Sequence, residues 1–178
     1  MKKIALIAAI FLTYSTYAQV QLKPVDAKNA VSFDIKNFGI KVNGTLSGLK
    51  GAIKWDAANL GKSSFDISLD INTINTESTG RDNHLKKDDY FDAAKYPTLN
   101  FVSNKITGQA NGGFLVEGKL TIKDVTKAVS IPFTVKLDGN AYIFSGTFAI
   151  NRRDYGIGGS SISMSDDVNV ALLVKAVE

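Results

Sequence analysis

Apolar and polar residues alternate along most of this chain with a period of two. In the clearest run, Phe65, Ile67 and Leu69 fall on one side of an extended backbone, and Asp66 and Ser68 fall on the other. This is the pattern of a β-strand with one buried and one exposed face. The pattern predicts eight strands, which are centred on residues 31–35, 42–55, 65–71, 99–101, 114–122, 129–137, 144–152 and 168–174.

Short turn signals join these predicted strands. Asn111-Gly112-Gly113 and Asp138-Gly139-Asn140 are typical hairpin turns. Consecutive hairpins need no crossover connections, and Gly44, Gly48 and Gly51 suit a strongly coiled strand. We therefore expect an all-β protein, an eight-stranded antiparallel lipocalin-like barrel with a short helical insert. A two-sheet sandwich is the competing architecture.

The alternation stops between residues 79 and 101, where the chain is densely charged. The spacing predicts a short helix from Thr79 to Leu85, with Thr79 as its cap and Asp82 near its positively polarised end. Asp92–Lys95 is expected to form one more turn. A charged helical segment in an otherwise all-β chain is expected to act as a lid or rim over an open barrel end.

Residues 1–18 have the features of a cleaved signal peptide. Two lysines precede an apolar run from Ile4 to Leu12, and small residues follow it. The run is too short to cross a bilayer, and a buried first strand is the alternative. We expect export, with residues 19–178 forming one domain that starts with a polar segment over residues 19–29. The chain has no cysteine, so disulfides cannot stabilise this domain.

The charge balance argues against nucleic acid as a partner. Without the two lysines of the signal peptide, the formal net charge falls from +4 to +2, and no basic stripe remains. The chain has one histidine and neither a G-x-S-x-G nor an H-E-x-x-H motif. The acids near His84, which are Asp82, Asp88, Asp89 and Asp92, spread around a short helix. Neither a metal site nor a catalytic residue is therefore expected.

The strand faces predicted to point inwards are rich in Phe, Ile, Leu and Val. An eight-stranded barrel is near the size at which side chains either fill the interior or leave room for one ligand. Periodicity leaves both alternatives open, although inward Gly118 and Gly146 are expected to leave space. An apolar cavity would take a lipid-like ligand. The candidate contacts on the barrel wall are Phe33, Phe65, Ile67, Phe101, Phe133, Phe144 and Phe148.

Arg152 continues the inward face of its predicted strand after Phe148 and Ile150. A buried unpaired guanidinium is costly, so Arg152 is expected to lie near a barrel end. We expect it to pair with Asp154 or with an acid of the insert. The functional hypothesis is that it also holds the polar head group of a ligand.

The insert supplies the remaining candidate ligand contacts. Arg81 and His84 are three residues apart and are predicted to share a helix face. Leu85 is expected to point into the barrel, and Phe91 is a further candidate for which packing is the simpler explanation. The alternative for Arg81 and Asp82 is that they pair with neighbours and fasten the insert over the barrel end.

Several stretches resemble the signature of the YceI-like family. They are Arg81–Phe101, Val116–Lys127 and Asn151–Ile157, with looser agreement over Phe33–Gly39 and Lys41–Ile53. The resemblance implies a lipocalin-like periplasmic barrel that binds a long isoprenoid chain, such as a polyprenyl or isoprenoid-quinone-type lipid, in an apolar tunnel. The sequence departs from the family pattern at Lys87, where a small polar residue is commoner, and at Asp124, where glycine is usual.

These observations predict a periplasmic binding or carrier protein for a long-chain amphiphile, with no other cofactor. The alternatives are an enzyme acting on an amphiphile, with His84 as base, and a stress-response structural module with a filled barrel. No amphipathic basic helix is present, so we expect transient membrane contact rather than stable residence. The sequence leaves a homodimer open.

Overall fold

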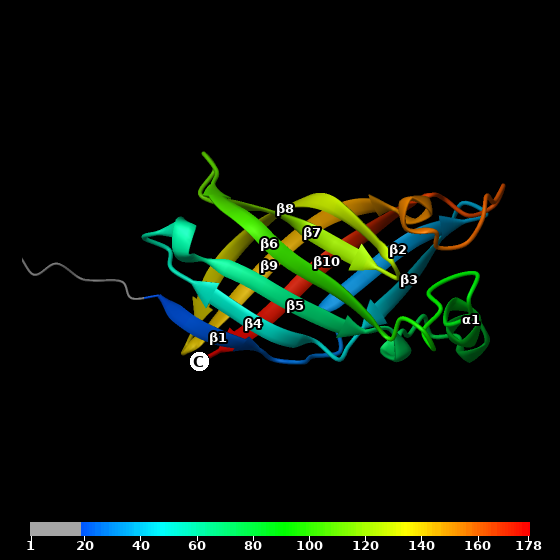
Figure 1. The fold of residues 1–178 in the computed structure, drawn as a ribbon, viewed down its shortest axis with the longest axis horizontal. Helices are drawn as coiled ribbons and strands as arrows, with labels where there is room; N and C mark the ends of the chain where they lie inside the picture. The colour runs from blue at the N-terminus through cyan, green and yellow to red at the C-terminus, as the bar shows by residue number, and fades with distance from the viewer. Residues whose placement is uncertain (1–18) are drawn as a thin grey trace, which may run out of the picture.

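The computed structural model describes residues 19–178, which form an elongated β-barrel with a helical insert at one end (Figure 1). The predicted signal peptide lies outside the described residues. The strands are β1 (Val20–Pro24), β2 (Val31–Asn37), β3 (Ile40–Leu46), β4 (Lys50–Trp55), β5 (Ser64–Asp70), β6 (Thr98–Gly108), β7 (Phe114–Ile122), β8 (Val125–Asp138), β9 (Ala141–Asn151) and β10 (Asp167–Val177). The described residues also contain one α-helix, α1 (Thr79–Leu85), and three 3₁₀ turns, η1 (Leu60–Lys62), η2 (Ile71–Thr73) and η3 (Arg152–Tyr155).

All ten strands belong to one antiparallel sheet that closes on β10. One edge of β10 pairs with β9, and the other edge pairs with β2 and then with β1. Since β1 also pairs with β4 and β2 with β3, β1 and β2 occupy one position around the barrel, and β3 and β4 occupy the next. The predicted eight-stranded antiparallel barrel is therefore confirmed.

The polar segment expected at the start of the domain is in part a strand. β1 places Val20 beside Trp55 on β4, and the side chain of Leu22 is 1% exposed. Two alternating apolar residues are too few for a period to stand out in the sequence. Pairing with β4 and β10 supplies the hydrogen bonds and the burial that make this segment extended.

The long second stretch predicted over residues 42–55 is broken into β3 and β4. Gly48 lies in the break with a φ of 72°, a conformation that favours glycine. Gly51 faces β5 so closely that a Cβ atom would lie 2.0 Å from the carbonyl oxygen of Asp66. These glycines let the wall of the barrel bend and coil, as the sequence predicts.

α1 spans the predicted residues but is held differently at its start. Ser78 occupies the N-cap position without a side-chain hydrogen bond, so the prediction of Thr79 as the cap is wrong. The carboxylate of Asp82 instead accepts hydrogen bonds from the backbone N–H of Thr76 at 2.8 Å and from its hydroxyl at 2.5 Å. The turn predicted at Asp92–Lys95 is confirmed by a hydrogen bond from the Lys95 N–H to the Asp92 carbonyl.

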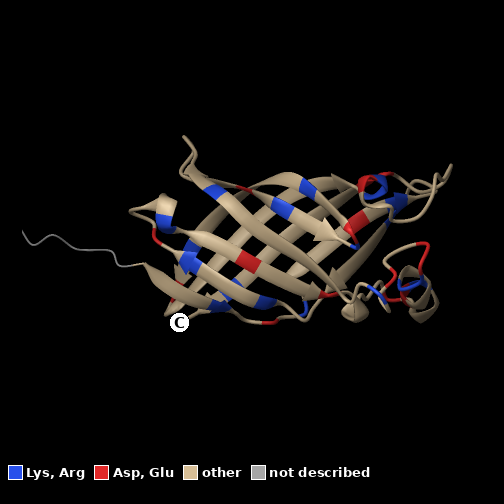
Figure 2. Ribbon diagram, in the orientation of Figure 1, with Lys and Arg blue, Asp and Glu red and all other residues tan. Residues whose placement is uncertain are grey.

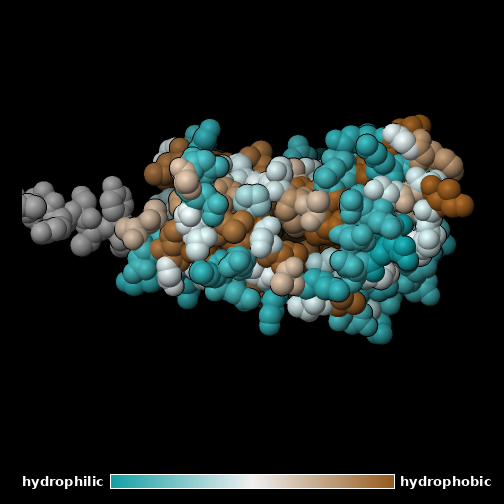
Figure 3. All heavy atoms as spheres, turned by 90° about the horizontal axis from the view of Figure 1, so that it is seen from above, coloured by the Kyte–Doolittle hydropathy of each residue, from teal (hydrophilic) through white to brown (hydrophobic). Residues whose placement is uncertain are grey.

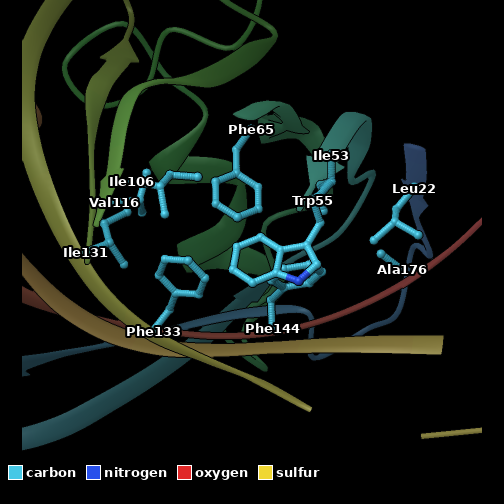
Figure 4. Packing of buried hydrophobic residues seen from close by; sticks show 10 residues of the cluster. All are labelled: Leu22, Ile53, Trp55, Phe65, Ile106, Val116, Ile131, Phe133, Phe144 and Ala176. Carbon is cyan, nitrogen blue, oxygen red and sulfur yellow. The ribbon is translucent and has the colours of Figure 1, made fainter. Parts of the chain in front are cut away.

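The barrel end opposite α1 is filled by aromatic rings. The ring centroids of Phe114, Phe144 and Phe133 lie 5.0, 5.7 and 6.0 Å from that of Trp55, all in edge-on geometry. Phe65 makes edge contacts with Phe133 and Phe144, both at 5.5 Å. Figure 4 shows most of these rings converging with aliphatic side chains from the surrounding strands. We call this part of the interior the filled end.

Candidate functional site

Beyond the filled end, the barrel encloses a cavity of about 260 Å³. Its wall consists mainly of Val, Ile, Leu and Phe side chains from the inward faces of the strands. The polar side chains in the lining are few: Asn37, Thr76, Arg81, Tyr90, Ser145 and Arg152. The expectation of an apolar interior is confirmed, and the alternative of a wholly filled barrel does not describe this half of the molecule.

Three segments surround the mouth of the cavity. They are the hairpin joining β2 and β3, the loop of residues 156–166 between η3 and β10, and the insert of residues 76–96 (Figure 1). The Gly158 N–H donates to the Asp89 carbonyl at 2.9 Å, which joins the loop to the insert. The Ser165 N–H donates to the carbonyl of Lys36 at 2.9 Å, which joins the loop to the hairpin. The rim is therefore one hydrogen-bonded unit.

Eleven of the twelve residues predicted from the sequence as ligand contacts line this cavity. Seven come from the wall strands, and four come from the insert and from η3. They are Phe33, Phe65, Ile67, Phe101, Phe133, Phe144, Phe148, Arg81, Leu85, Phe91 and Arg152.

His84 is the exception. Its Nε2 atom lies 3.5 Å from a carboxylate oxygen of Asp89, and its ring meets that of Tyr90 edge-on at 5.0 Å. The side chain is 53% exposed. The expectation that His84 faces the cavity together with Arg81 is wrong, because three residues fall about 60° short of a full helical turn. That offset is enough to turn His84 away from the interior.

The cavity also has lining residues that the sequence did not single out. Val42 and Val168 follow the alternation of their strands, which places Val168 on the face of the last predicted strand, but neither residue was among the predicted ligand contacts. Ile157 and Met164 lie in the loop of residues 156–166, where no periodic signal exists. Only the folding of this loop over the barrel end brings them to the cavity.

The inward glycines do not simply leave empty space. A Cβ atom on Gly118 would lie 2.5 Å from the ring of Phe101, so that ring packs directly on the glycine backbone. A Cβ atom on Gly146 would lie 2.6 Å from the carbonyl oxygen of Pro132. Gly146 lines the cavity, as the prediction of inward space implies, but both glycines also allow close packing of the neighbouring strand and of Phe101.

Arg152 is buried, with 2% of its surface exposed, and it holds the loop of residues 156–166 in place. Its Nη2 atom donates to the carboxylate of Asp166 at 2.8 Å. Asp166 is thus the ionic partner, and the expected pairing with Asp154 or with an acid of the insert is wrong. The remaining bonds go to carbonyl oxygens, from Nε to Ser165 at 2.9 Å and from Nη1 to Ile157 at 2.8 Å and Gly159 at 2.9 Å.

These bonds occupy four of the five N–H groups that a guanidinium carries. Arg152 is therefore satisfied within the chain, and its main action is to close the rim. The adjoining Tyr155 is buried against Leu120, Ile122 and Ile157. Burial raises the pKa of the Tyr155 phenol, with a smaller contribution from the nearby Asp154 carboxylate.

Arg81 is only partly satisfied within the chain. Its Nε donates to the hydroxyl of Thr76 at 2.8 Å, and its Nη2 donates to the Thr76 carbonyl at 2.6 Å. Asp82 binds the same threonine from the other side. Arg81 and Asp82 thus pair with a neighbour, as the alternative predicts, but Thr76 belongs to the insert itself, so these bonds hold the start of α1 and do not join the insert to the barrel. Within residues 19–178, the Nη1 atom of Arg81 donates no hydrogen bond. This leaves a cationic donor at the mouth of an apolar cavity.

Neither a cluster of metal-binding side chains nor a membrane-spanning helix is found in residues 19–178. No group of three His, Asp or Glu side chains in residues 19–178 is close enough together to hold a metal ion. No helix in the same part of the chain is long and apolar enough to cross a bilayer.

Comparison with known proteins places the chain in a family. The family model of the YceI-like domain matches residues 21–176. A UPF0312 protein of Pseudomonas savastanoi pv. phaseolicola is 32% identical over 136 residues, which cover 72% of this chain and 71% of the relative. A UPF0312 protein of Shewanella denitrificans is 27% identical over 164 residues, with 86% of each chain covered.

Solved structures share this fold. BcnA of Burkholderia cenocepacia superimposes with a TM-score of 0.78 at 24% identity, covering 88% of this chain and 96% of its own. A polyisoprenoid binding domain from Saccharophagus degradans, implicated in plant cell wall breakdown, has the same fold with a TM-score of 0.64 at 14% identity, covering 88% of this chain and 97% of its own. The match to residues 21–176 spans nearly the whole described barrel, and this chain therefore belongs to the YceI-like family.

Proposed function

We propose that this protein binds a long-chain amphiphile of the isoprenoid type, such as a polyprenyl or isoprenoid-quinone-type lipid, and carries it in the periplasm. The observation that carries the proposal is the apolar cavity, whose few polar side chains include Arg81 and Thr76 at the mouth. The signal-peptide pattern of residues 1–18 supports export. Membership of the YceI-like family, with a polyisoprenoid binding domain among the proteins of the same fold, supports the ligand class.

The tail of the ligand occupies the cavity in this proposal. Each methylene that leaves water contributes roughly 0.8 kcal/mol to binding, reduced by the cost of ordering the chain. An apolar cavity of about 150 Å³ holds one benzene molecule, so the observed 260 Å³ accommodates a segment of about ten carbons. A longer tail requires side chains such as Phe101 and Phe133 to move aside, towards the filled end.

The head group lies at the mouth, against Arg81. The free Nη1 donor suits a carbonyl, hydroxyl or phosphate oxygen, and hydrogen bonds from charged donors are stronger than neutral ones. Arg152 contributes by holding the rim, since its own donors are almost all in use. Catalysis is not part of the proposal, because the one histidine of the chain points away from the cavity.

Mass spectrometry of an organic extract of the purified protein tests this function directly. We expect an isoprenoid lipid near one equivalent per protein, and saturable binding when an isoprenoid quinone is titrated into protein freed of lipid. The matched variants are Leu172→Trp, which fills the cavity, and Leu173→Trp on the other face of the same strand, where the side chain is 56% exposed. Only Leu172→Trp should lose binding.

Two results would contradict the proposal. The first is an extract without lipid from a protein that also fails to bind an added isoprenoid quinone. The second is a Leu172→Trp variant that keeps its circular dichroism spectrum and binds the quinone as tightly as the unmodified protein.

A further inference from the structure

Three large apolar side chains stand exposed beside the cavity mouth. Phe38 is 82% exposed and Ile40 70% exposed on the hairpin between β2 and β3, and Ile162 is fully exposed on the loop of residues 156–166. The two segments are tied together, because the Phe38 N–H donates to the Ser163 carbonyl at 2.7 Å. Figure 3 shows apolar atoms gathered at this end of the molecule. We call Phe38, Ile40 and Ile162 the apolar tip.

The position of Phe38 is unfavourable for an aromatic residue. Phe38 and Gly39 are the two central residues of the hairpin turn, with φ values of 50° and 76°. Turns of this type favour Asn, Asp or Gly, because a bulky side chain resists a positive φ. With 82% of the residue exposed, packing inside the chain does not offset this strain. A strained residue with an outward side chain is typical of a contact made with something outside the molecule.

Lysines bracket the hairpin part of the apolar tip. Lys36 precedes the turn and forms no salt bridge with any residue in 19–178, and Lys41 follows the turn and pairs with Asp34 at 3.0 Å. Lysine stems lie along apolar surface while their ammonium groups stay at the polar boundary. When the turn enters an apolar layer, Lys36 and Lys41 are therefore placed to meet a layer of phosphate groups above it.

The loop part of the apolar tip is free of charge. Residues 156–165 contain no charged side chain, as the tan loop in Figure 2 shows. The charges next to this loop nearly cancel, since two arginines lie among three aspartates. Arg152 and Arg153 both contact Asp166, and Asp154 and Asp167 are the exposed acids nearby.

The apolar tip is continuous with the cavity. Val42 lies two residues beyond Ile40 on the inward face of β3 and lines the cavity, as do Asn37 and Met164, which are paired across the hairpin and the loop. An amphiphile that leaves an apolar layer at the tip therefore meets the cavity lining next.

We propose that the apolar tip inserts into the head-group region of a phospholipid bilayer, with the cavity mouth facing the membrane. A second copy of the chain fits less well: a stable interface buries about 800 Å² on each partner. A large aromatic side chain supplies only about 150–250 Å², and the tip has three large residues. This docking does not depend on the identity of the ligand in the cavity. It would let a lipid pass between the bilayer and the cavity without crossing water.

Flotation with phosphatidylcholine vesicles tests this docking in the lipid-loaded and in the extracted protein. The test variant combines Phe38→Asn, Ile40→Thr and Ile162→Ser; asparagine suits the positive φ at residue 38, so the barrel should remain folded. The control is Leu137→Thr, which removes a side chain that is 67% exposed on β8, near the filled end. We expect a loss of at least about tenfold in vesicle binding for the triple variant and none for the control.

The charge balance around the tip adds a second expectation. Adding anionic phosphatidylglycerol to the vesicles should change binding by less than about threefold, because one unpaired lysine contributes only about 1 kcal/mol near an anionic surface and the nearby acids oppose it.

Three results would overturn the docking. They are unmodified protein that stays unbound to vesicles of either composition, a triple variant that floats as well as the unmodified protein, and tip-dependent dimers in analytical ultracentrifugation without lipid. The proposed function is tested separately, since the triple variant should still yield the same lipid on extraction. Conversely, a Leu172→Trp variant that loses the lipid but still floats with vesicles would show that membrane docking does not require a ligand in the cavity.

Discussion

The two ends of this barrel are built from the same alternating strands but are stabilised in different ways. At the filled end, Trp55 packs edge-on against three phenylalanine rings, and the interior is closed. At the cavity end, the rings line a hollow, and the rim is held by hydrogen bonds to Arg152 and Thr76. Apolar packing thus stabilises one end, and polar bonds replace it where space is left for a ligand.

This difference shows that inward alternation alone does not decide whether a barrel is hollow. A strand pattern fixes which side chains point inwards, but filling depends on whether large rings from opposite walls reach the same point. In this molecule they do so around Trp55 and fail to do so beneath the insert.

The largest expected effect is at the filled end. Trp55→Ala should lower the free energy of unfolding by about 3–5 kcal/mol, because it removes a buried ring together with three aromatic contacts. Phe33→Ala, at the partly open cavity, should cost about 1–2 kcal/mol, since less contact is lost. Guanidinium unfolding of both variants measures the difference. Equal losses would mean that the two ends do not differ in packing energy.

The polar rim should be almost as sensitive as the aromatic cluster. Arg152→Met leaves three carbonyl oxygens without their donor and leaves the Asp166 carboxylate with only the more distant Arg153, and should cost about 3 kcal/mol. Its neighbour Arg153 is half-exposed and lies 3.5 Å from the same carboxylate. Arg153→Met should therefore cost less than about 0.5 kcal/mol. Thermal unfolding of the Arg152→Met and Arg153→Met variants measures these two losses of stability. A loss for Arg152→Met as small as that for Arg153→Met would show that packing stabilises the rim as well.

Removal of the free donor at the mouth should affect binding more than stability. Arg81→Met should raise the Kd for an isoprenoid quinone by about tenfold, which corresponds to the loss of one charged hydrogen bond. Asn83→Ala, on an exposed position of the same helix, is the control and should bind normally. Calorimetric titration reports both values. An unchanged Kd for Arg81→Met would place the head group elsewhere.

The smallest effect concerns acid stability near the hairpin. The hydrogen bond from Asn169, with help from Lys41, lowers the pKa of the Asp34 carboxyl below its usual value of 3.8. Its stabilising contribution is therefore present above about pH 4 and is lost as the pH falls through the lowered pKa. In the Asp34→Asn variant, the free energy of unfolding should therefore fall by about 0.5 kcal/mol less than in the unmodified protein as the pH is lowered.

The measurement is urea unfolding between pH 5 and pH 2.5, with Asp167→Asn as the control for removal of one acid. If the free energy of unfolding of the unmodified protein falls no more steeply with decreasing pH than that of Asp34→Asn, this contact contributes nothing to stability.

The sequence by itself determined the barrel, the insert and most of the cavity wall. A period of two is a local property, so Phe65, Ile67 and Phe148 could be assigned to the interior without knowledge of their neighbours in space. The same pattern does not predict the short strand β1, because two apolar residues do not establish a period. Only pairing with β4 makes this segment extended.

Only the tertiary structure decided what depends on contacts between distant segments. The partner of Arg152 is Asp166, 14 residues away along the chain, and it is brought there by a loop with no pattern of its own. His84 lies beside Asp89 and outside the cavity lining, which the three-residue spacing from Arg81 did not reveal. Alternation fixes the direction of each side chain, whereas ion partners and empty space depend on how the loops and rings meet in three dimensions.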